Sequence, residues 1–191
     1  MAAKENVGLN EAFQVDEIIQ FALSKGKHTT SYKYAFFQSI LDTIETAQHN
    51  TEHYFLSFNT IAYRFTELYW DLVLHSHIKQ MPTSAHYEMT KIERLLLNFY
   101  ENSENKKYLT FPFSCQNTIS QNKLINQVVS LIKKDVLDAF HKDTKGKLFS
   151  IDLLNDSITF LDDTYSVLCN KKSIYTAQNL DEWIKYIEKI N

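Results

Sequence analysis

The sequence predicts a mainly α-helical fold, a multi-helix single domain over residues 1–191 with one small β-hairpin. Only 3 Gly and 2 Pro occur in 191 residues, so the chain lacks the many turn residues that an all-β fold requires. Apolar residues instead recur three and four positions apart along most of the chain, which is the spacing of one helical face. Hydrophobic residues make up 44% of the chain, enough for a sizeable core.

Three helices are expected in the first part of the chain. The first covers residues 10–25, and the second begins after Thr30 or Ser31, either of which is a suitable N-cap. The third begins near Ser57, beyond a polar stretch at residues 47–54 that predicts a connection without regular structure.

A fourth helix is expected after Pro82, with Thr83 or Ser84 as its cap. The apolar stretch at residues 109–113 contains a proline and is at best an edge strand. Residues 120–141 form the longest periodic segment and predict the longest helix.

Two elements are expected near the C-terminus. The apolar runs 147–153 and 157–161 flank a turn around Asn155 and predict the small hairpin. A closing helix is expected from Asn179, because Asn179 and Glu182 have the spacing of a capping box.

The sequence contains no complete catalytic or metal-binding motif, so no catalytic residue, metal ligand or cofactor is predicted. His75 and His77 lie two positions apart and point to different sides of a helix, which prevents them from sharing an ion. Cys115 and Cys169 form neither a C-x-x-C pair nor a disulfide framework. No apolar run approaches the ~18 residues that a membrane span needs. We therefore expect a cytoplasmic chain without a membrane partner.

Basic residues are the remaining candidates for a binding site. The net charge of −3 does not predict non-specific binding to nucleic acids, so any such contact must come from a local patch. Lysines suit phosphate contacts, although most lysine clusters are simply solvated surface. The candidate nucleic-acid-binding residues are Lys25, Lys27, Lys33, Arg64, Lys145 and Lys147.

Three blocks of sequence resemble the N-terminal region of bacterial HNH-endonuclease proteins. They are SYKYAFFQSILDTIE from Ser31, LSFNTIAYRFTELYW from Leu56, and DEWIKYIEKIN from Asp181, in the same order as in that family. The resemblance runs from about residue 29 to Asn191. In such proteins the nuclease module, with its divalent metal, follows the closing helix, so its catalytic residues have no counterpart in this sequence.

The resemblance implies a non-catalytic DNA-targeting, sensing or scaffold domain of an HNH-type endonuclease, in bacterial defence against foreign DNA. Its partners would be DNA, an HNH nuclease module or another protein. Two successive helices and a later hairpin also leave open a degenerate winged helix-turn-helix, which would turn Lys33, Arg64 and the lysines around Gly146 towards phosphates. The alternative is a protein-interaction or dimerisation module that docks through apolar surfaces, with a homo-oligomer as one form.

Overall fold

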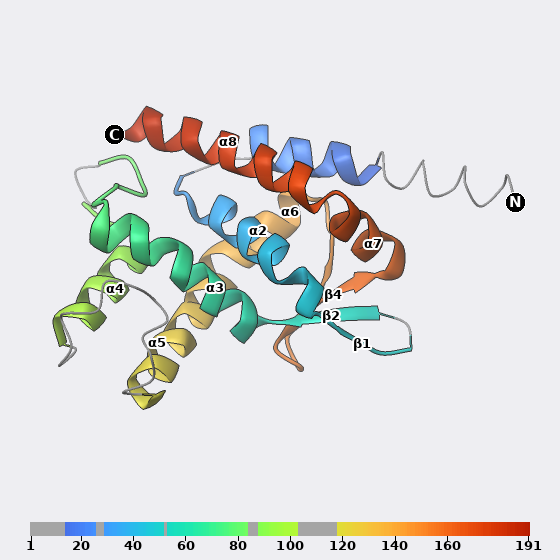
Figure 1. The fold of residues 1–191 in the computed structure, drawn as a ribbon, viewed down its shortest axis with the longest axis horizontal. Coiled ribbons are helices and arrows are strands. Elements are labelled where there is room, and N and C mark those ends of the chain that lie inside the picture. The colour runs from blue at the N-terminus through green and yellow to red at the C-terminus, as the bar shows by residue number, and fades with distance from the viewer. Residues whose placement is uncertain (1–13, 26–28, 52, 84–87, 103–117) are drawn as a thin grey trace, which may run out of the picture.

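The computed structural model describes residues 14–25, 29–51, 53–83, 88–102 and 118–191, and it is mostly helical (Figure 1). Residues 14–24 form a first helix. The other helices are α2 (Tyr32–Thr43), α3 (Phe58–Trp70), α4 (Lys91–Asn102), α5 (Thr118–Leu131), α6 (Leu137–Asp143), α7 (Asp162–Asn170) and α8 (Lys172–Ile190). Short irregular helical turns follow α2 (η1, Ile44–Thr46) and α3 (η2, Asp71–His75) and join α5 to α6 (η3, Ile132–Val136). The predicted mainly α-helical, single-domain fold is confirmed.

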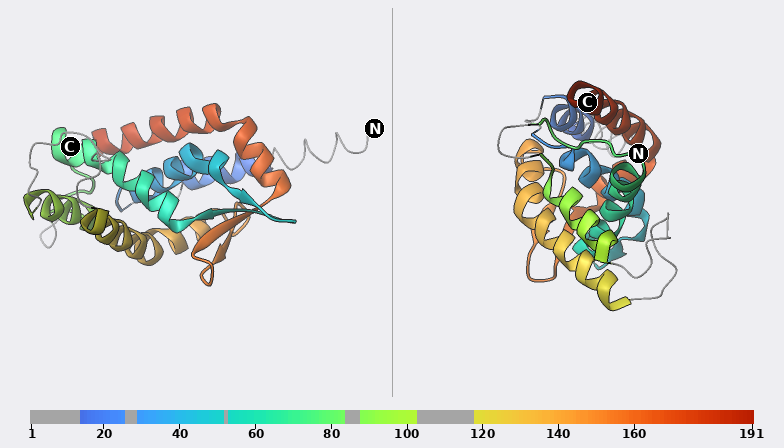
Figure 2. Two further views of the ribbon diagram at one scale, coloured as in Figure 1. Left: turned by 60° about the horizontal axis from the view of Figure 1, so that its bottom comes forward. Right: turned by 90° about the vertical axis from the view of Figure 1, so that its left-hand side faces the viewer.

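A four-stranded antiparallel sheet lies at one end of the helices, in the order β1-β2-β4-β3 (Figure 2). Its strands are β1 (Gln48–His49), β2 (His53–Ser57), β3 (Ser150–Asp152) and β4 (Ser157–Leu161). The hairpin predicted near residues 147–161 is confirmed as β3 and β4. The expectation of an irregular connection at residues 47–54 is wrong, because β2 pairs along its whole length with the distant β4.

Helix α2 lies in the middle of the bundle, between α8 and α3 (Figure 1). All of its residues from Tyr32 to Leu41 are buried, so it is covered on every side. Phe36 and Phe37 place their rings 5.5 and 5.6 Å from the ring of Phe140 on α6. A helix buried all round must find internal partners for each of its polar side chains.

A chain of polar contacts crosses the bundle from α3 through α2 to α8. Arg64 donates from Nε to Asp42 Oδ2 at 2.7 Å, and Gln38 donates to the other oxygen of Asp42 at 2.8 Å. Asn179 then donates to Gln38 Oε1 and to the carbonyl of Tyr34, both at 3.0 Å. Three helices are therefore joined by one hydrogen-bonded network.

The expected start of the closing helix at Asn179 is wrong. Helix α8 begins at Lys172, and Asn179 is fully buried in its interior, where its side chain bonds α2 instead of capping. Asp181 and Glu182, which also match a helix start by sequence, lie in mid-helix and form ion pairs with Lys185. The spacing of a capping box also occurs inside helices, and here the residue at its first position is buried in the helix interior and does not cap.

The predicted starts of α2 and α3 are capped differently. Ser31 occupies the N-cap position of α2, but its hydroxyl makes no capping bond and contacts Tyr69 and Gln80 instead. Ser57 does cap α3, accepting from the backbone N–H of Thr60 at 3.1 Å. The start of the third helix near Ser57 is confirmed.

Helix α4 starts later than predicted. It begins at Lys91, not beside Thr83; Ser84 and the predicted edge strand at 109–113 lie outside the described residues. Glu93 accepts from the backbone N–H of Thr90 at 2.5 Å, and Thr90 Oγ1 accepts from the N–H of Glu93 at 3.3 Å. This Thr-x-x-Glu capping box is present in the sequence and marks the helix start correctly.

The tight turn of a helix-turn-helix motif does not connect α2 to α3. The turn η1 and the strands β1 and β2 lie between the two helices. One face of α3, from Phe58 to Trp70, is packed into the core. The described helices therefore do not present α3 as a recognition helix would be presented. None of them combines the length and apolar character needed to cross a bilayer.

We predict that Asn179→Ala lowers the free energy of unfolding by about 1–3 kcal/mol, because Gln38 Oε1 and the Tyr34 carbonyl would be left buried without this donor. Urea unfolding measures the change. Gln178→Ala, at the exposed neighbouring position, is the matched control and should stay within about 0.5 kcal/mol of wild type. Equal effects of the two substitutions would contradict the role of the network.

Candidate functional site

Two of the six candidate phosphate-binding residues form internal ion pairs. Lys33 is buried, and its ammonium group donates to Asp143. Arg64 pairs with Asp42 at 2.7 Å and with Glu67 at 2.9 Å. The positive charge of both side chains is therefore balanced within the fold.

Two other candidates, Lys145 and Lys147, lie in the turn after α6, and Lys25 directly follows the helix of residues 14–24, which lies against this turn. Lys145 holds its ammonium 5.8 Å from the ring centre of Phe21, and Lys25 donates its backbone N–H to the carbonyl of Phe21. Lys147 lies beside the same helix, with Gln14 on the wall of a shared cleft. All three lysines are exposed and form no ion pair with a described residue. Lys27 lies outside the described residues.

The turn that presents Lys145 and Lys147 is an unusual helix C-terminus. Gly146 donates its N–H to the carbonyl of His141, and Lys145 donates to that of Lys142, which is the Schellman pattern. Lys145 has φ +54°, at the position where glycine is usually found. At Gly146, with φ +66°, an added Cβ would lie 3.2 Å from the ring of His141. The fold therefore places a lysine in a backbone conformation that lysine rarely adopts.

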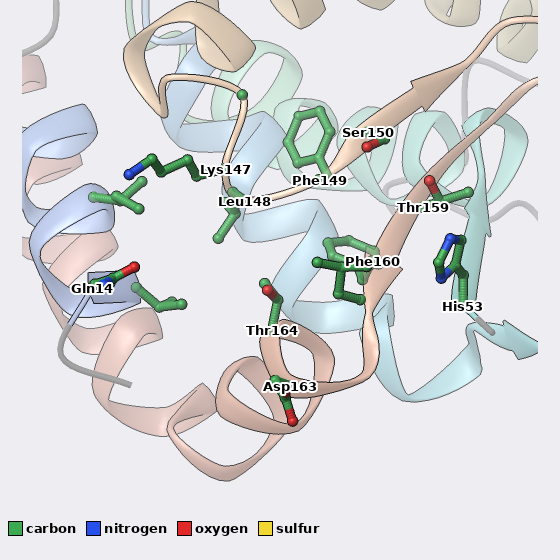
Figure 3. Close-up of a pocket in the computed structure, with 14 residues that line it drawn as sticks. Gln14, His53, Lys147, Leu148, Phe149, Ser150, Thr159, Phe160, Asp163 and Thr164 are labelled. Carbon is green, nitrogen blue, oxygen red and sulfur yellow. The ribbon is translucent and has the colours of Figure 1, made fainter. Parts of the chain in front are cut away.

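A cleft of about 340 Å³ opens beside this turn, between the helix of residues 14–24, the segment 146–150, and the junction of β4 with α7 (Figure 3). Apolar side chains form much of its lining, which includes Val15, Ile18, Leu148, Phe149, Phe160 and Leu161. Polar groups on its walls include Gln14, His53, Lys147, Thr159, Asp163 and Thr164. Figure 3 shows Lys147 and Gln14 on the same side of the cleft, whereas the carboxylate of Asp163 points away from the other labelled side chains.

One wall of the cleft is held in place by a carboxylate. Asp16 accepts from Lys171 Nζ and from the Tyr175 hydroxyl, each at 2.6 Å, and so fixes the helix of residues 14–24 to α8. Burial alone would raise the pKa of Asp16, but the hydrogen bonds from Lys171 and Tyr175 outweigh it and lower the pKa below 3.8. Burial and the neighbouring Asp16 carboxylate raise the pKa of Tyr175.

The tip of the β3–β4 hairpin exposes two leucines. The side chain of Leu153 is 63% exposed and that of Leu154 is 98% exposed. Asp152 holds the turn by accepting from the backbone N–H groups of Leu154 and Asn155 at 3.1 and 3.0 Å. At the other end of the turn, Asp156 accepts from Lys133 Nζ at 2.5 Å. The tip is thus an ordered apolar projection between two carboxylates.

The hairpin tip and the cleft were both missed by sequence reasoning. Two adjacent leucines in a turn, where polar residues are usual, were the available signal for the tip. The cleft draws its walls from segments far apart in the sequence, so no local pattern could indicate it.

The described side chains form no arrangement that favours catalysis. They contain no group of three potential metal ligands. His75 is exposed and contacts Asp71 at 3.1 Å. Burial raises the pKa of the Cys169 thiol, which disfavours the thiolate. The tip, the cleft and the turn that presents Lys145 and Lys147 are surfaces suited to binding.

Residues 11–185 match a family defined by a domain of unknown function, DUF8808. The chain belongs to the DUF8808 family. Searches of curated proteins and of solved structures gave no match. The DUF8808 match includes the helix of residues 14–24, the cleft and the hairpin tip, so all three surfaces lie within the family domain.

We predict that Asp16→Asn lowers stability at pH 7 by roughly 0.5–1 kcal/mol, a modest value because the ion pair is partly exposed to solvent. The pKa of Asp16 is lower in the folded than in the unfolded chain, so its contribution is complete above pH 3.8 and disappears as the pH falls below that value. Unfolding curves of both proteins from pH 7 to pH 3 measure this. A difference in the free energy of unfolding between the two proteins that grows on acidification would contradict this prediction.

Proposed function

We propose that this DUF8808 chain is a non-catalytic protein-docking module that inserts its hairpin tip into a partner protein. The observation that carries the proposal is the exposure of Leu153 and Leu154, at 63% and 98%, on a turn whose backbone is held by Asp152. Burying a leucine side chain contributes about 1.5–3 kcal/mol, so two leucines supply a substantial share of a docking free energy.

The order of the turn favours docking further. An ordered loop loses less conformational entropy on binding than a flexible one, so more of the apolar contribution remains as affinity. Three hydrogen bonds to Asp152 fix the turn before any partner is bound, including one from the Asn155 side chain at 2.7 Å. The carboxylate of Asp152 favours a partner surface that carries positive charge beside an apolar centre, whereas the charge of Asp156 is balanced by Lys133.

The resemblance to N-terminal regions of HNH endonucleases supports the same role. A module that docks or pairs nuclease subunits needs no catalytic residue of its own, which agrees with the side chains found here. We accordingly propose a scaffold function beside such a nuclease, in bacterial defence. This part of the proposal rests on the resemblance alone.

We predict that Leu153→Ser with Leu154→Ser abolishes docking without harming the fold. Both side chains are exposed, so the free energy of unfolding should change by less than about 0.5 kcal/mol. A photo-reactive benzoylphenylalanine in place of Leu154 should cross-link to protein in the cell that makes the chain. The cross-linked protein is then purified, and its affinity for wild type and for the double serine variant is measured.

The matched control is the exposed Ile119 on α5, which is 82% exposed and lies outside the hairpin. The photo-reactive group at position 119 should give no specific adduct, and Ile119→Ser should bind as wild type does. Absence of any protein adduct from position 154 would overturn the docking proposal.

A second candidate function is contact with DNA phosphates. The exposed Lys145 and Lys147 share one turn, and Lys25 follows the helix that lies against this turn, which favours such a contact. Such a contact would position the chain on DNA without reading its sequence. The internal pairing of Lys33 and Arg64 makes this the weaker proposal, because it reduces the positive charge that the patch can offer.

If DNA is bound, changing Lys25, Lys145 and Lys147 to Gln should weaken binding equally for unrelated duplexes. Fluorescence anisotropy should show log Kobs becoming less dependent on log[salt] by roughly 0.9 per lost phosphate contact. The control changes the equally exposed Lys123, Lys134 and Lys189 to Gln. No anisotropy change with the wild-type chain at low salt would eliminate this second function.

A further inference from the structure

We propose that the hairpin tip docks into a second copy of this chain, and that its receptor is the cleft between residues 14–24 and α7. This inference rests on the proposed docking function and names the partner. It requires that the tip and the cleft agree in size, polarity and charge. It also requires that the tip of a chain cannot enter the cleft of the same chain.

The hairpin tip and the cleft agree in size and polarity. The cleft measures about 340 Å³, and deletion of one leucine side chain from a protein core leaves a cavity of about 150 Å³, so two leucines are of the right size. The lining offers apolar contacts at Ile18 and at Leu161, which is itself 63% exposed. Docking would therefore cover three exposed apolar side chains, Leu153, Leu154 and Leu161, in one contact.

The charges are also complementary. Asp152 supplies the negative charge beside the leucines of the tip, and the hydrogen bonds from Asn155 and Leu154 lower its pKa. The charge of Asp156, on the other side of the leucines, is balanced by Lys133. Lys147 lies in the lining of the cleft, with Lys145 in the same turn. The carboxylate of Asp163, the acidic residue of the lining, points away from the other labelled side chains (Figure 3).

The tip cannot enter the cleft of its own chain. Ser150 lies in the cleft lining, and the extended strand β3 runs from there towards Leu153. Three residues of strand separate the tip from the cleft by roughly 10 Å. Because both surfaces lie on one unit, a two-fold axis between them would let each tip enter the other cleft, giving a closed dimer with two identical contacts.

The test is sedimentation velocity on the full chain. Three samples are compared: wild type, Leu153→Ser with Leu154→Ser as the tip variant, and Lys147→Glu as the cleft variant. Wild type should dimerise, and each variant should dimerise at least tenfold more weakly, because each loses both contacts. An equimolar mixture of the two variants should recover association, since the intact tip of one meets the intact cleft of the other.

Two controls accompany the variants. Ile119→Ser removes an exposed apolar side chain elsewhere, and Lys123→Glu reverses an exposed charge elsewhere; both should dimerise like wild type. Circular dichroism confirms that each variant folds. Because Leu153, Leu154 and Lys147 are exposed, their substitution should leave the spectrum unchanged.

Several outcomes would overturn the second-copy inference. One is a wild-type chain that remains monomeric up to about 1 mM, where a contact would be worth only about 4 kcal/mol. Others are tip or cleft variants that dimerise like wild type, or a mixture that stays monomeric. If the chain is monomeric while position 154 cross-links to a different protein whose purified form binds the tip, the docking function stands and only the second-copy inference falls.

Discussion

The complete burial of α2 is the constraint on which the rest of the structure depends. A helix surrounded by protein must pair its polar groups internally, and α2 does so on each side. Lys33 reaches Asp143 at the end of α6, and Gln38 joins Asp42 to Asn179 of α8. Each pairing also fixes a neighbouring helix, so satisfying α2 orders the bundle around it.

This constraint also separates structural charges from functional ones. Arg64 belongs to the network that crosses the bundle, and Lys33 pairs separately with Asp143, so the pairing of both with carboxylates is part of the fold. Lys147 lies outside these pairings and lines the cleft, with Lys145 in the same turn. The tip of the β3–β4 hairpin, on the sheet at one end of the bundle, carries the carboxylate of Asp152 beside its leucines. The buried interior thus leaves two exposed surfaces, the cleft and the hairpin tip, which we propose bind each other.

Local patterns in the sequence were sufficient to predict most helices and the β3–β4 hairpin. The helix expected after Thr30 or Ser31 and the start of α3 near Ser57 depend on neighbouring residues, and both are found. β1 and β2 could not be predicted in this way, because β2 depends on pairing with the remote β4. Asn179 was misassigned because a capping box and a buried helical position can share one spacing.

The candidate site was less predictable than the fold. Clustering in sequence selected Lys25, Lys145 and Lys147, which are exposed, but it could not show that Asp143 and Asp42 pair with Lys33 and Arg64. Those pairs join residues on different helices, and only the packing of α2 brings them together. The cleft combines residues of four segments. Its match to the hairpin tip depends on two folded surfaces, so no local sequence pattern could indicate it.

Hydrogen exchange of the full chain at low and high protein concentration tests the account most directly. The amides of α2 should exchange only through global unfolding at both concentrations, because this helix is buried on all sides. Protection should rise together at residues 153–155 and 146–149 as concentration increases, since tip and cleft form one contact. Fast exchange in α2 would contradict the account. So would a concentration-dependent rise in protection that is confined to the tip, to the cleft or to α8.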